Sequence, residues 1–264
     1  MHPARAVSVA TMALLLSVAS FFLATSANAA SVRYVALGDS YSAGVGAGNY
    51  DSSSGSCKRS ANSYAALWNS AHAPSSFAFV ACSGAVTGDV LNGQLSAVDS
   101  STTLISITIG GNDAGFSSTM QTCVLSGTSA CLSAVATAKA YADNTLPGQL
   151  DQLYAAIHAK APAAHVVVLG YPHLYHVGGG CWFGIGDTSR SAINGAADEL
   201  DLVIAKSAAN AGFTFADVRG IFTGHEICTD SQWLHSTTLP IDESYHPNAS
   251  GQSGGYLPTF SAVA

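Results

Sequence analysis

A serine near the start of the chain and a histidine near its end are the two residues with the clearest chemical potential. Ser40 follows a short β-type run, residues 32–37, and glycine recurs soon after it. A serine hydroxyl becomes a nucleophile when a base removes its proton, and histidine titrates in the range that this requires. His246 lies in the segment E-S-Y-H-P-N near the other end of the chain. The pair predicts attack by Ser40 with His246 as general base.

Two other turns carry groups that could stabilise the oxyanion formed by such an attack. Donors already aimed at the developing charge contribute roughly 3–4 kcal/mol each. The backbone N–H groups of Ser40 and Gly84 and the side-chain amide of Asn112 are the candidates. Taken alone, Gly84 reads as an ordinary turn glycine, and Asn112 reads equally well as a helix cap.

The strands that must position these residues are visible as apolar, β-branched runs between helical stretches. The predicted strands are residues 32–37, 77–81, 104–109, 165–169 and 213–218. Strands that alternate with helices predict a five-stranded parallel sheet with helices on both faces, an α/β fold. Ligands of such sheets bind beyond the carboxyl ends of the strands. Ser40, Gly84 and Asn112 follow the first three strands, so the three residues should meet at one edge.

Three helices are predicted from apolar spacing and from start and stop signals. They cover residues 63–71, 133–160 and 188–210, and Pro147-Gly148 should break or kink the second. The third has a continuous apolar stripe and ends near Gly212. Pro247-Asn248 should start a final helix that holds the histidine turn in place. Neither a repeat nor a long linker interrupts the chain.

The first 29 residues have the pattern of a secretory signal peptide. A short basic start precedes an apolar stretch, residues 10–23, and Ala27-Asn28-Ala29 supplies a small-x-small cleavage pattern. The alternative, a membrane anchor, is disfavoured because the stretch is short and no basic flank follows it. We therefore expect one catalytic domain, residues 30–264, that is secreted and has no stable membrane anchor.

Charge and cysteine content limit which binding partners and cofactors are expected. After removal of the first 29 residues, eight Lys/Arg remain against sixteen Asp/Glu, a net charge of about −8, so no basic patch for nucleic acid is expected. All six cysteines lie in the exported part, which favours three disulfides but leaves 15 pairings open. Because the chain lacks C-x-x-C and its histidines do not cluster near cysteines, zinc is disfavoured and no metal or cofactor is expected.

The candidate residues resemble, in type and order, the four blocks of the SGNH hydrolases, also called the GDSL esterase/lipase family. The blocks are Gly38-Asp39-Ser40-Tyr41, then Gly84, then Gly110-Gly111-Asn112-Asp113, then His246. The likeness spans residues 34–248, and the first and third blocks are its specific parts. Length and cysteine pattern are similar to those of the secreted actinobacterial branch, which contains lipases, esterases and phospholipases A1.

The resemblance implies a fold and a site. The fold is a flavodoxin-like three-layer α/β/α sandwich. The nucleophile is Ser40, the base is His246, and the oxyanion hole is formed by Ser40, Gly84 and Asn112. The enzyme needs no metal, and a monomer is expected. Cysteine pairing in sequence order, as in this branch, gives Cys57–Cys82, Cys123–Cys131 and Cys181–Cys228.

One position departs from the family pattern. The usual acid is an aspartate three residues before the histidine, but this chain has Glu243 there and Asp242 one step earlier. Glutamate is one methylene longer and could still orient the imidazole. In several members of the branch a backbone carbonyl does so instead, which here would be that of Ser244. Both arrangements stay open at the level of sequence.

Several other residues attract attention without being expected to react. The segment G-Q-S-G-G, residues 251–255, matches G-x-S-x-G, but no strand precedes Ser253 and no histidine follows it. Asp39 and Asp113 are expected to bond to loop backbone. Tyr171-Pro172-His173 is expected to line the substrate cleft. The aromatic residues Trp182, Phe183 and Trp233 lie near cysteines and would form either a wall for an acyl chain or ordinary packing around a disulfide.

The predicted function is hydrolysis of carboxylic, acyl or lipid esters through an acyl-enzyme on Ser40. A carbohydrate O-deacetylase that uses the same site is the alternative enzyme, and acetylated xylan would be its substrate. A secreted lipid- or glycan-binding module without activity is the alternative from another class. It is disfavoured because residues of all four blocks are present.

Overall fold

A five-stranded sheet forms the centre of the protein. The computed structural model describes residues 31–178 and 184–264. The strands are β1 (Arg33–Gly38), β2 (Ser76–Phe79), β3 (Leu104–Thr108), β4 (His165–Leu169) and β5 (Thr214–Ala216). They lie in the order β2-β1-β3-β4-β5, and every neighbouring pair is parallel. All five predicted strands are present, and the predicted parallel α/β architecture is confirmed.

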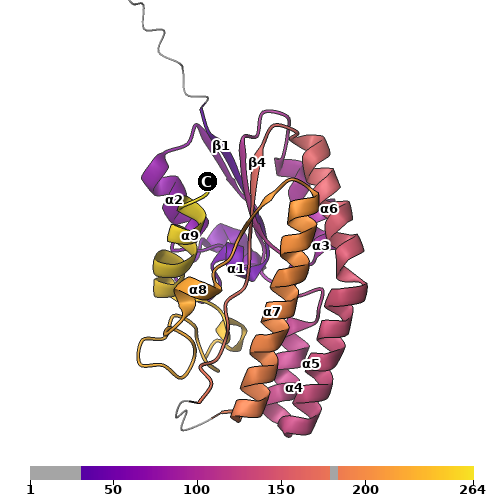
Figure 1. The fold of residues 1–264 in the computed structure, drawn as a ribbon. Helices are drawn as coiled ribbons and strands as arrows, with labels where there is room; N and C mark the ends of the chain where they lie inside the picture. Colours follow the sequence, from indigo (N-terminus) through magenta and orange to yellow (C-terminus); the bar gives the residue numbers. More distant parts are fainter. Residues whose placement is uncertain (1–30, 179–183) are drawn as a thin grey trace, which may run out of the picture. The chain divides into compact units, whose positions relative to one another are not determined.

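Helices cover both faces of the sheet, as Figure 1 shows, with α2 and α9 on one side and α3, α6 and α7 on the other. Their bounds are α1 (Ser40–Ala43), α2 (Tyr64–His72), α3 (Thr87–Asn92), α4 (Phe116–Leu125), α5 (Gly127–Asn144), α6 (Leu146–Lys160), α7 (Asp187–Asn210), α8 (Arg219–Phe222) and α9 (Leu257–Ser261). Three 3₁₀ segments are η1 (Ser52–Cys57), η2 (Gln94–Ala97) and η3 (Ile241–Glu243), and η4 (Gly251–Tyr256) is π-helical. The side chains of β1, β3 and β4 are almost all buried, as both faces of a covered sheet require.

The helical stretch predicted over residues 133–160, with a break or kink at Pro147-Gly148, consists of two helices, α5 and α6. The break falls at Thr145, and Pro147 lies in the first turn of α6, where a missing N–H costs no hydrogen bond. The first of the two helices, α5, begins at Gly127, earlier than predicted. The sequence patterns did not predict α4, which packs against α5 and is joined to it by the Cys123–Cys131 disulfide.

The end of the chain returns to the sheet as a helix that begins soon after Pro247-Asn248, as predicted. Asn248 caps it, because its side-chain oxygen accepts from the Gly251 N–H at 3.0 Å. The π-helical turn and α9 follow without interruption, and the fully buried Phe260 packs against Tyr34 of β1. Packing of α9 against α2 completes the layer that supports the histidine turn.

Two of the three predicted disulfides are present, Cys57–Cys82 and Cys123–Cys131. The first joins the loop after β1 to the turn after β2, which carries Gly84. Cys181 lies outside the described residues, and so does the predicted pair Cys181–Cys228. The predicted signal peptide, residues 1–29, also lies outside them. Among the residues that are described, no helix is both long enough and apolar enough to cross a membrane.

Candidate active site

Ser40 is presented by a sharp strand–turn–helix at the carboxyl end of β1. It is the first residue of α1, and Asp39 caps this helix by accepting from the Tyr41 N–H at 3.0 Å. The Thr108 hydroxyl, at the end of β3, also donates to Asp39 at 2.6 Å. Ser40 therefore lies in a short helix whose start is tied to two neighbouring strands, as expected for the edge where ligands bind.

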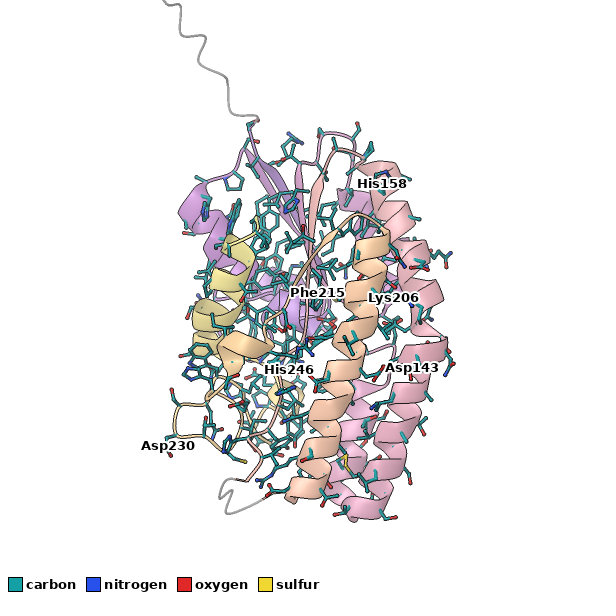
Figure 2. The ribbon with its side chains drawn as sticks, viewed as in Figure 1. Asp143, His158, Lys206, Phe215, Asp230 and His246 are labelled. Atoms are coloured by element: carbon teal, nitrogen blue, oxygen red, sulfur yellow. A yellow bond between two sulfur atoms is a disulfide. The ribbon has the colours of Figure 1, made fainter. Side chains whose placement is uncertain are left out.

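His246 lies on a turn that is held in place by the nearby residue His235 and by the distant residue Tyr41, and Figure 2 labels it below Phe215 of β5. The His235 N–H donates to the His246 carbonyl, and the Tyr245 N–H donates to the His235 carbonyl, both at 3.0 Å. The Tyr41 hydroxyl, next to Ser40, donates to the Tyr245 carbonyl at 2.7 Å. Tyr245 has a positive φ of 67°, a backbone conformation that costs energy and concentrates at functional sites.

The loop after α1 packs closely against the other side of the same turn and holds it in place. The His235 imidazole Nε2 lies 2.8 Å from the Gly46 carbonyl oxygen. A Cβ at position 46 would lie 2.9 Å from the Pro247 carbonyl oxygen and 3.1 Å from the His246 Cβ. Glycine is therefore required at position 46, where φ is also positive, so that the two loops can meet.

The structure brings Ser40 and His246 into hydrogen-bond contact. Ser40 Oγ lies 2.7 Å from His246 Nε2, although 206 positions separate the residues in the chain. His246 Nδ1 lies 3.1 Å from the Ser244 carbonyl oxygen. A carbonyl oxygen can only accept, so Nδ1 carries the proton and Nε2 is left to accept from the serine hydroxyl. This tautomer is the one that a general base needs.

The Glu243 side chain has other partners. Its carboxylate accepts from the Tyr50 hydroxyl at 2.9 Å and lies 3.7 Å from Lys58 Nζ. Asp242 pairs with the same lysine at 2.5 Å. The sequence left open whether Glu243 or the Ser244 carbonyl contacts the imidazole. In the structure the Ser244 carbonyl does so, and both acidic side chains lie against Lys58.

Two titratable groups of the site have shifted pKa values. Burial lowers the pKa of His246 to about 4, because the charged imidazolium is poorly solvated there, and the hydrogen bond to Ser244 opposes this shift. Burial raises the pKa of Asp39 to about 6, against hydrogen bonds from Thr108, Tyr171 and Tyr41 that favour the carboxylate. At neutral pH the imidazole is thus uncharged and Asp39 is ionised.

Gly84 and Asn112 follow β2 and β3 at the same edge of the sheet. The Asn112 Nδ2 donates to the Ala85 carbonyl at 3.0 Å, which ties the two turns together and leaves its second amide hydrogen available. Gly84 is exposed, with a φ of +79° and nothing within 4 Å of where a Cβ would be. Within residues 31–178 and 184–264, no protein acceptor is assigned to the Ser40 or Gly84 N–H. These donors remain able to bind an oxyanion.

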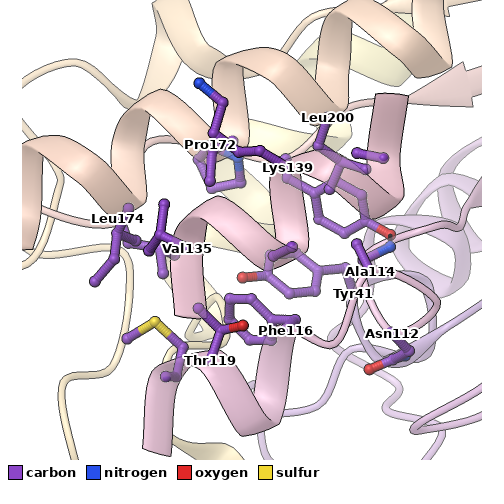
Figure 3. A pocket seen from close by; sticks show the side chains of 18 of the residues that line it. Tyr41, Asn112, Ala114, Phe116, Thr119, Val135, Lys139, Pro172, Leu174 and Leu200 are labelled. Atoms are coloured by element: carbon purple, nitrogen blue, oxygen red, sulfur yellow. Dashed lines mark hydrogen bonds between the residues drawn. The ribbon is translucent and has the colours of Figure 1, made fainter. Parts of the chain in front are cut away.

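A pocket opens beside Ser40 and Asn112 and runs between helices α4, α5 and α7. Its cavity volume is about 80 Å³, and it is partly open to solvent. Figure 3 shows Asn112 near one end of the pocket and the apolar side chains of Phe116, Val135 and Leu200 around it. Its charged lining residues are Asp39 and Lys139, and Lys139 Nζ lies 3.9 Å from Glu199 across the rim. An apolar pocket beside a nucleophile suits a hydrocarbon chain.

The structure shows the surroundings of three further groups of residues that the sequence analysis singled out. Tyr171 and Pro172 line this pocket, whereas His173 does not and instead contacts Asp198 at 2.8 Å. Asp39 and Asp113 accept backbone N–H groups as predicted, the latter from Thr87 at 3.1 Å. Trp233 forms no acyl wall, because its ring stacks on His225 at 3.6 Å and packs edge-on against Phe222. Trp182 and Phe183 lie outside the described residues.

The G-Q-S-G-G segment has a packing explanation. A Cβ at position 254 would lie 2.9 Å from the Trp233 ring, and one at position 255 would lie 2.3 Å from the Phe222 ring. The exposed Ser253 donates to the Ala249 carbonyl at 2.9 Å within its own helix. The motif therefore reflects close helix packing, and the hydrogen bond of its serine goes to a backbone carbonyl.

Sequence reasoning missed the residues that hold the site together. The fully buried Gln252 donates to the Tyr41 carbonyl at 3.0 Å and accepts from the Tyr64 N–H at 2.9 Å. His235 bonds both to the histidine turn and to Gly46. No local pattern marks either residue, because Gln252 binds partners 188 and 211 positions away and the imidazole of His235 binds Gly46, 189 positions away.

The chain is similar to known hydrolases over most of its length. The model of the GDSL-like Lipase/Acylhydrolase family matches residues 36–253. A lipase from Streptomyces rimosus is 62% identical over 230 residues, covering 87% of this chain and 86% of that protein. Lipase 1 of Streptomyces coelicolor is also 62% identical, over 89% of this chain and 88% of the relative.

Solved structures agree with the sequence matches. The crystal structure of the extracellular lipase from Streptomyces rimosus has a TM-score of 0.87 at 61% identity and covers 88% of this chain and all of that one. Phospholipase A1 from Streptomyces albidoflavus also has a TM-score of 0.87, at 56% identity, over 89% of this chain and all of its own. Family model, relatives and structures lead to one conclusion: this chain belongs to the GDSL-like lipase/acylhydrolase family.

Proposed function

We propose that this protein is a secreted serine hydrolase that cleaves the acyl esters of lipids. The observation that carries the proposal is the 2.7 Å contact between Ser40 Oγ and His246 Nε2 beside a largely apolar pocket. The relatives named lipase and phospholipase A1 support an acyl ester as the substrate. The signal-peptide pattern and two disulfides support export, because disulfides persist outside the cytoplasm.

The reaction begins when His246 Nε2 takes the hydroxyl proton as Ser40 Oγ attacks the ester carbonyl. The carbonyl oxygen gains the negative charge, and the Ser40 N–H, the Gly84 N–H and the free Asn112 amide hydrogen are the donors proposed to bind it. The imidazolium then gives its proton to the leaving alkoxide, so that the alcohol departs and an acyl-enzyme remains. His246 next takes a proton from water as the water oxygen attacks the acyl carbon, and the imidazolium then returns this proton to Ser40 Oγ as the carboxylic acid leaves.

The pocket favours long acyl chains over acetyl groups. Burial of each methylene contributes about 0.8 kcal/mol, or about fourfold in kcat/KM when it is fully used in the transition state. We expect kcat/KM for p-nitrophenyl esters to rise from the acetyl to the octanoyl ester. Ala138→Phe fills the pocket and should therefore remove this increase with chain length, while the butyryl ester is still cleaved. Spectrophotometric assays across the acyl series measure both effects.

Ala140→Phe is the matched control, because Ala140 lies on the same helix but is exposed to solvent. This variant should keep the chain-length profile of the wild type. A preference for acetyl esters, together with activity on acetylated xylan, would contradict the proposal and select the O-deacetylase alternative.

Glu243 is not proposed as the acid of a triad. The Ser244 carbonyl accepts from His246 Nδ1 and orients the ring, whereas Glu243 binds Tyr50 and Lys58. We expect Glu243→Gln to change kcat by less than about threefold, in line with the small contribution of partly exposed ion pairs. Loss of an orienting acid would instead lower kcat by up to about 10⁴-fold. Asp242→Asn is the matched control, since Asp242 shares Lys58, and a large loss in either variant would return an acid to the mechanism.

The enzyme should remain active down to an unusually low pH. His246 accepts a proton only when neutral, so kcat/KM decreases as pH falls through the imidazole pKa, which burial lowers from 6.5 to about 4. We expect activity on a soluble ester to stay on its plateau at pH 6 and to reach half its value well below pH 6. If the midpoint lies near 6 and moves in Asp39→Asn, titration of Asp39 sets the limit and the prediction is wrong.

A further inference from the structure

Tyr171 is fixed at both of its ends beside the candidate active site. It follows β4, and its backbone N–H donates at 2.9 Å to the carboxylate of the fully buried Asp201 on α7. Its ring is buried and meets the Tyr41 ring edge-on, with the centroids 5.1 Å apart. The side chain therefore has little freedom, and the position of its hydroxyl is set by the fold.

The Tyr171 hydroxyl joins two loops through two hydrogen bonds. It donates to the Asp39 carboxylate in a short contact, and it accepts from the Gly111 N–H at 3.3 Å. Asp39 directly precedes the candidate nucleophile Ser40, and Gly111 directly precedes the candidate oxyanion donor Asn112. One oxygen atom thus links the carboxyl ends of β1 and β3 on the side that faces the pocket.

Gly111 is shaped to receive this tyrosine. A Cβ at position 111 would lie 3.3 to 3.5 Å from three atoms at the hydroxyl end of the Tyr171 ring, including 3.4 Å from the oxygen itself. A Cβ there would contact the hydroxyl end of the ring tightly, and the ring would have to shift by a few tenths of an ångström. The close contact between the Gly111 backbone and the Tyr171 hydroxyl therefore depends on residue 111 having no side chain.

We propose that Tyr171 is a positioning residue, whose hydroxyl sets the distance between the Ser40 nucleophile and the Asn112 amide. The proposal rests on the ester hydrolase mechanism above. A displacement of about 1 Å can cost roughly a hundredfold in rate, because preorganised donors act only at the right distance. The substrate binds mainly through its acyl chain, so loss of the bridge should lower kcat and leave KM nearly unchanged.

The test is Tyr171→Phe, which keeps the ring and removes only the oxygen atom. We expect kcat for p-nitrophenyl butyrate to fall at least about tenfold, with KM changed by less than about twofold. Tyr154→Phe is the matched control, because Tyr154 is fully buried and its hydroxyl has no hydrogen-bond partner among the described residues. A kcat in Tyr171→Phe within twofold of that in Tyr154→Phe would overturn the proposal.

A double-mutant cycle separates positioning from general loosening of the fold. If the bridge acts through Asn112, Tyr171→Phe should have almost no further effect on kcat in an Asn112→Ala background, because interacting residues are non-additive. Equal fold losses in both backgrounds would overturn the proposal. Failure of the underlying mechanism is recognised separately, since Ser40→Ala would then stay active whatever the result at Tyr171.

Discussion

We expect replacement of Ser40 by alanine to lower kcat/KM for ester hydrolysis by at least about a thousandfold, as loss of a catalytic nucleophile does in comparable serine hydrolases. The reason is that the attacking oxygen disappears while the pocket and the other donors remain. The variant should fold normally, because the Ser40 side chain makes its hydrogen bond with His246 and holds no other element in place. Activity on p-nitrophenyl butyrate and thermal unfolding, measured together, check both parts.

Ser253→Ala is the control for Ser40→Ala. Ser253 is the serine of the G-x-S-x-G match, but its exposed hydroxyl bonds only to the Ala249 carbonyl of its own helix, so activity should equal that of the wild type. A fluorophosphonate probe should label wild-type protein at Ser40, located by peptide mass spectrometry, and should not label Ser40→Ala. Residual activity above roughly a thousandth of the wild-type level would indicate another nucleophile.

Replacement of His246 by glutamine should lower kcat/KM by a similar factor, about a thousandfold or more. Glutamine fills much of the imidazole volume and can hydrogen-bond to Ser40, but it cannot take up and return the proton. The Ser244 carbonyl would lose its donor, and the Ser40 hydroxyl would stay protonated. Pre-steady-state assays should show that formation of the acyl-enzyme is the step that slows.

His225→Gln is the control for His246→Gln. His225 is a half-buried imidazole that stacks on Trp233 and bonds to the Ser231 carbonyl, outside the pocket lining. The double variant Ser40→Ala/His246→Gln should be no less active than either single variant, because the two residues act as one unit. Additive losses would mean that they work in separate steps, which the proposed mechanism does not allow.

Many features of this fold follow from local sequence patterns. Runs such as Leu104–Thr108 are short, apolar and β-branched, and a strand with both faces covered needs that composition. Their alternation with helices predicts a parallel sheet, and the residues after each strand then meet at one edge. This reasoning predicts that Ser40 and Asn112 lie at the same edge, and both line the same pocket there.

The helices and their ends are harder to predict from the sequence than the strands. The α4 helix was missed because its sequence, F-S-S-T-M-Q-T-C-V-L, is rich in hydroxyl residues with weak helix preference, and packing on α5 stabilises it. The pocket was missed for the same reason, since it exists only where α4, α5 and α7 leave space between them. The sequence predicts that Tyr171 and Pro172 line the cleft, and they do, but for Trp233 it leaves an acyl wall and ordinary packing open, because only proximity to a cysteine in the sequence is available there.

The sequence by itself determined the alternation of strands with helices, the edge at which the polar turns gather, and the residue types that could react there, because propensity, periodicity and turn chemistry are local properties. Only the tertiary structure decided what orients His246. The left-handed backbone at Tyr245 places the Ser244 carbonyl on the imidazole and leaves Glu243 to Tyr50. Such choices depend on contacts between segments about 190 to 210 residues apart, and no local pattern encodes them.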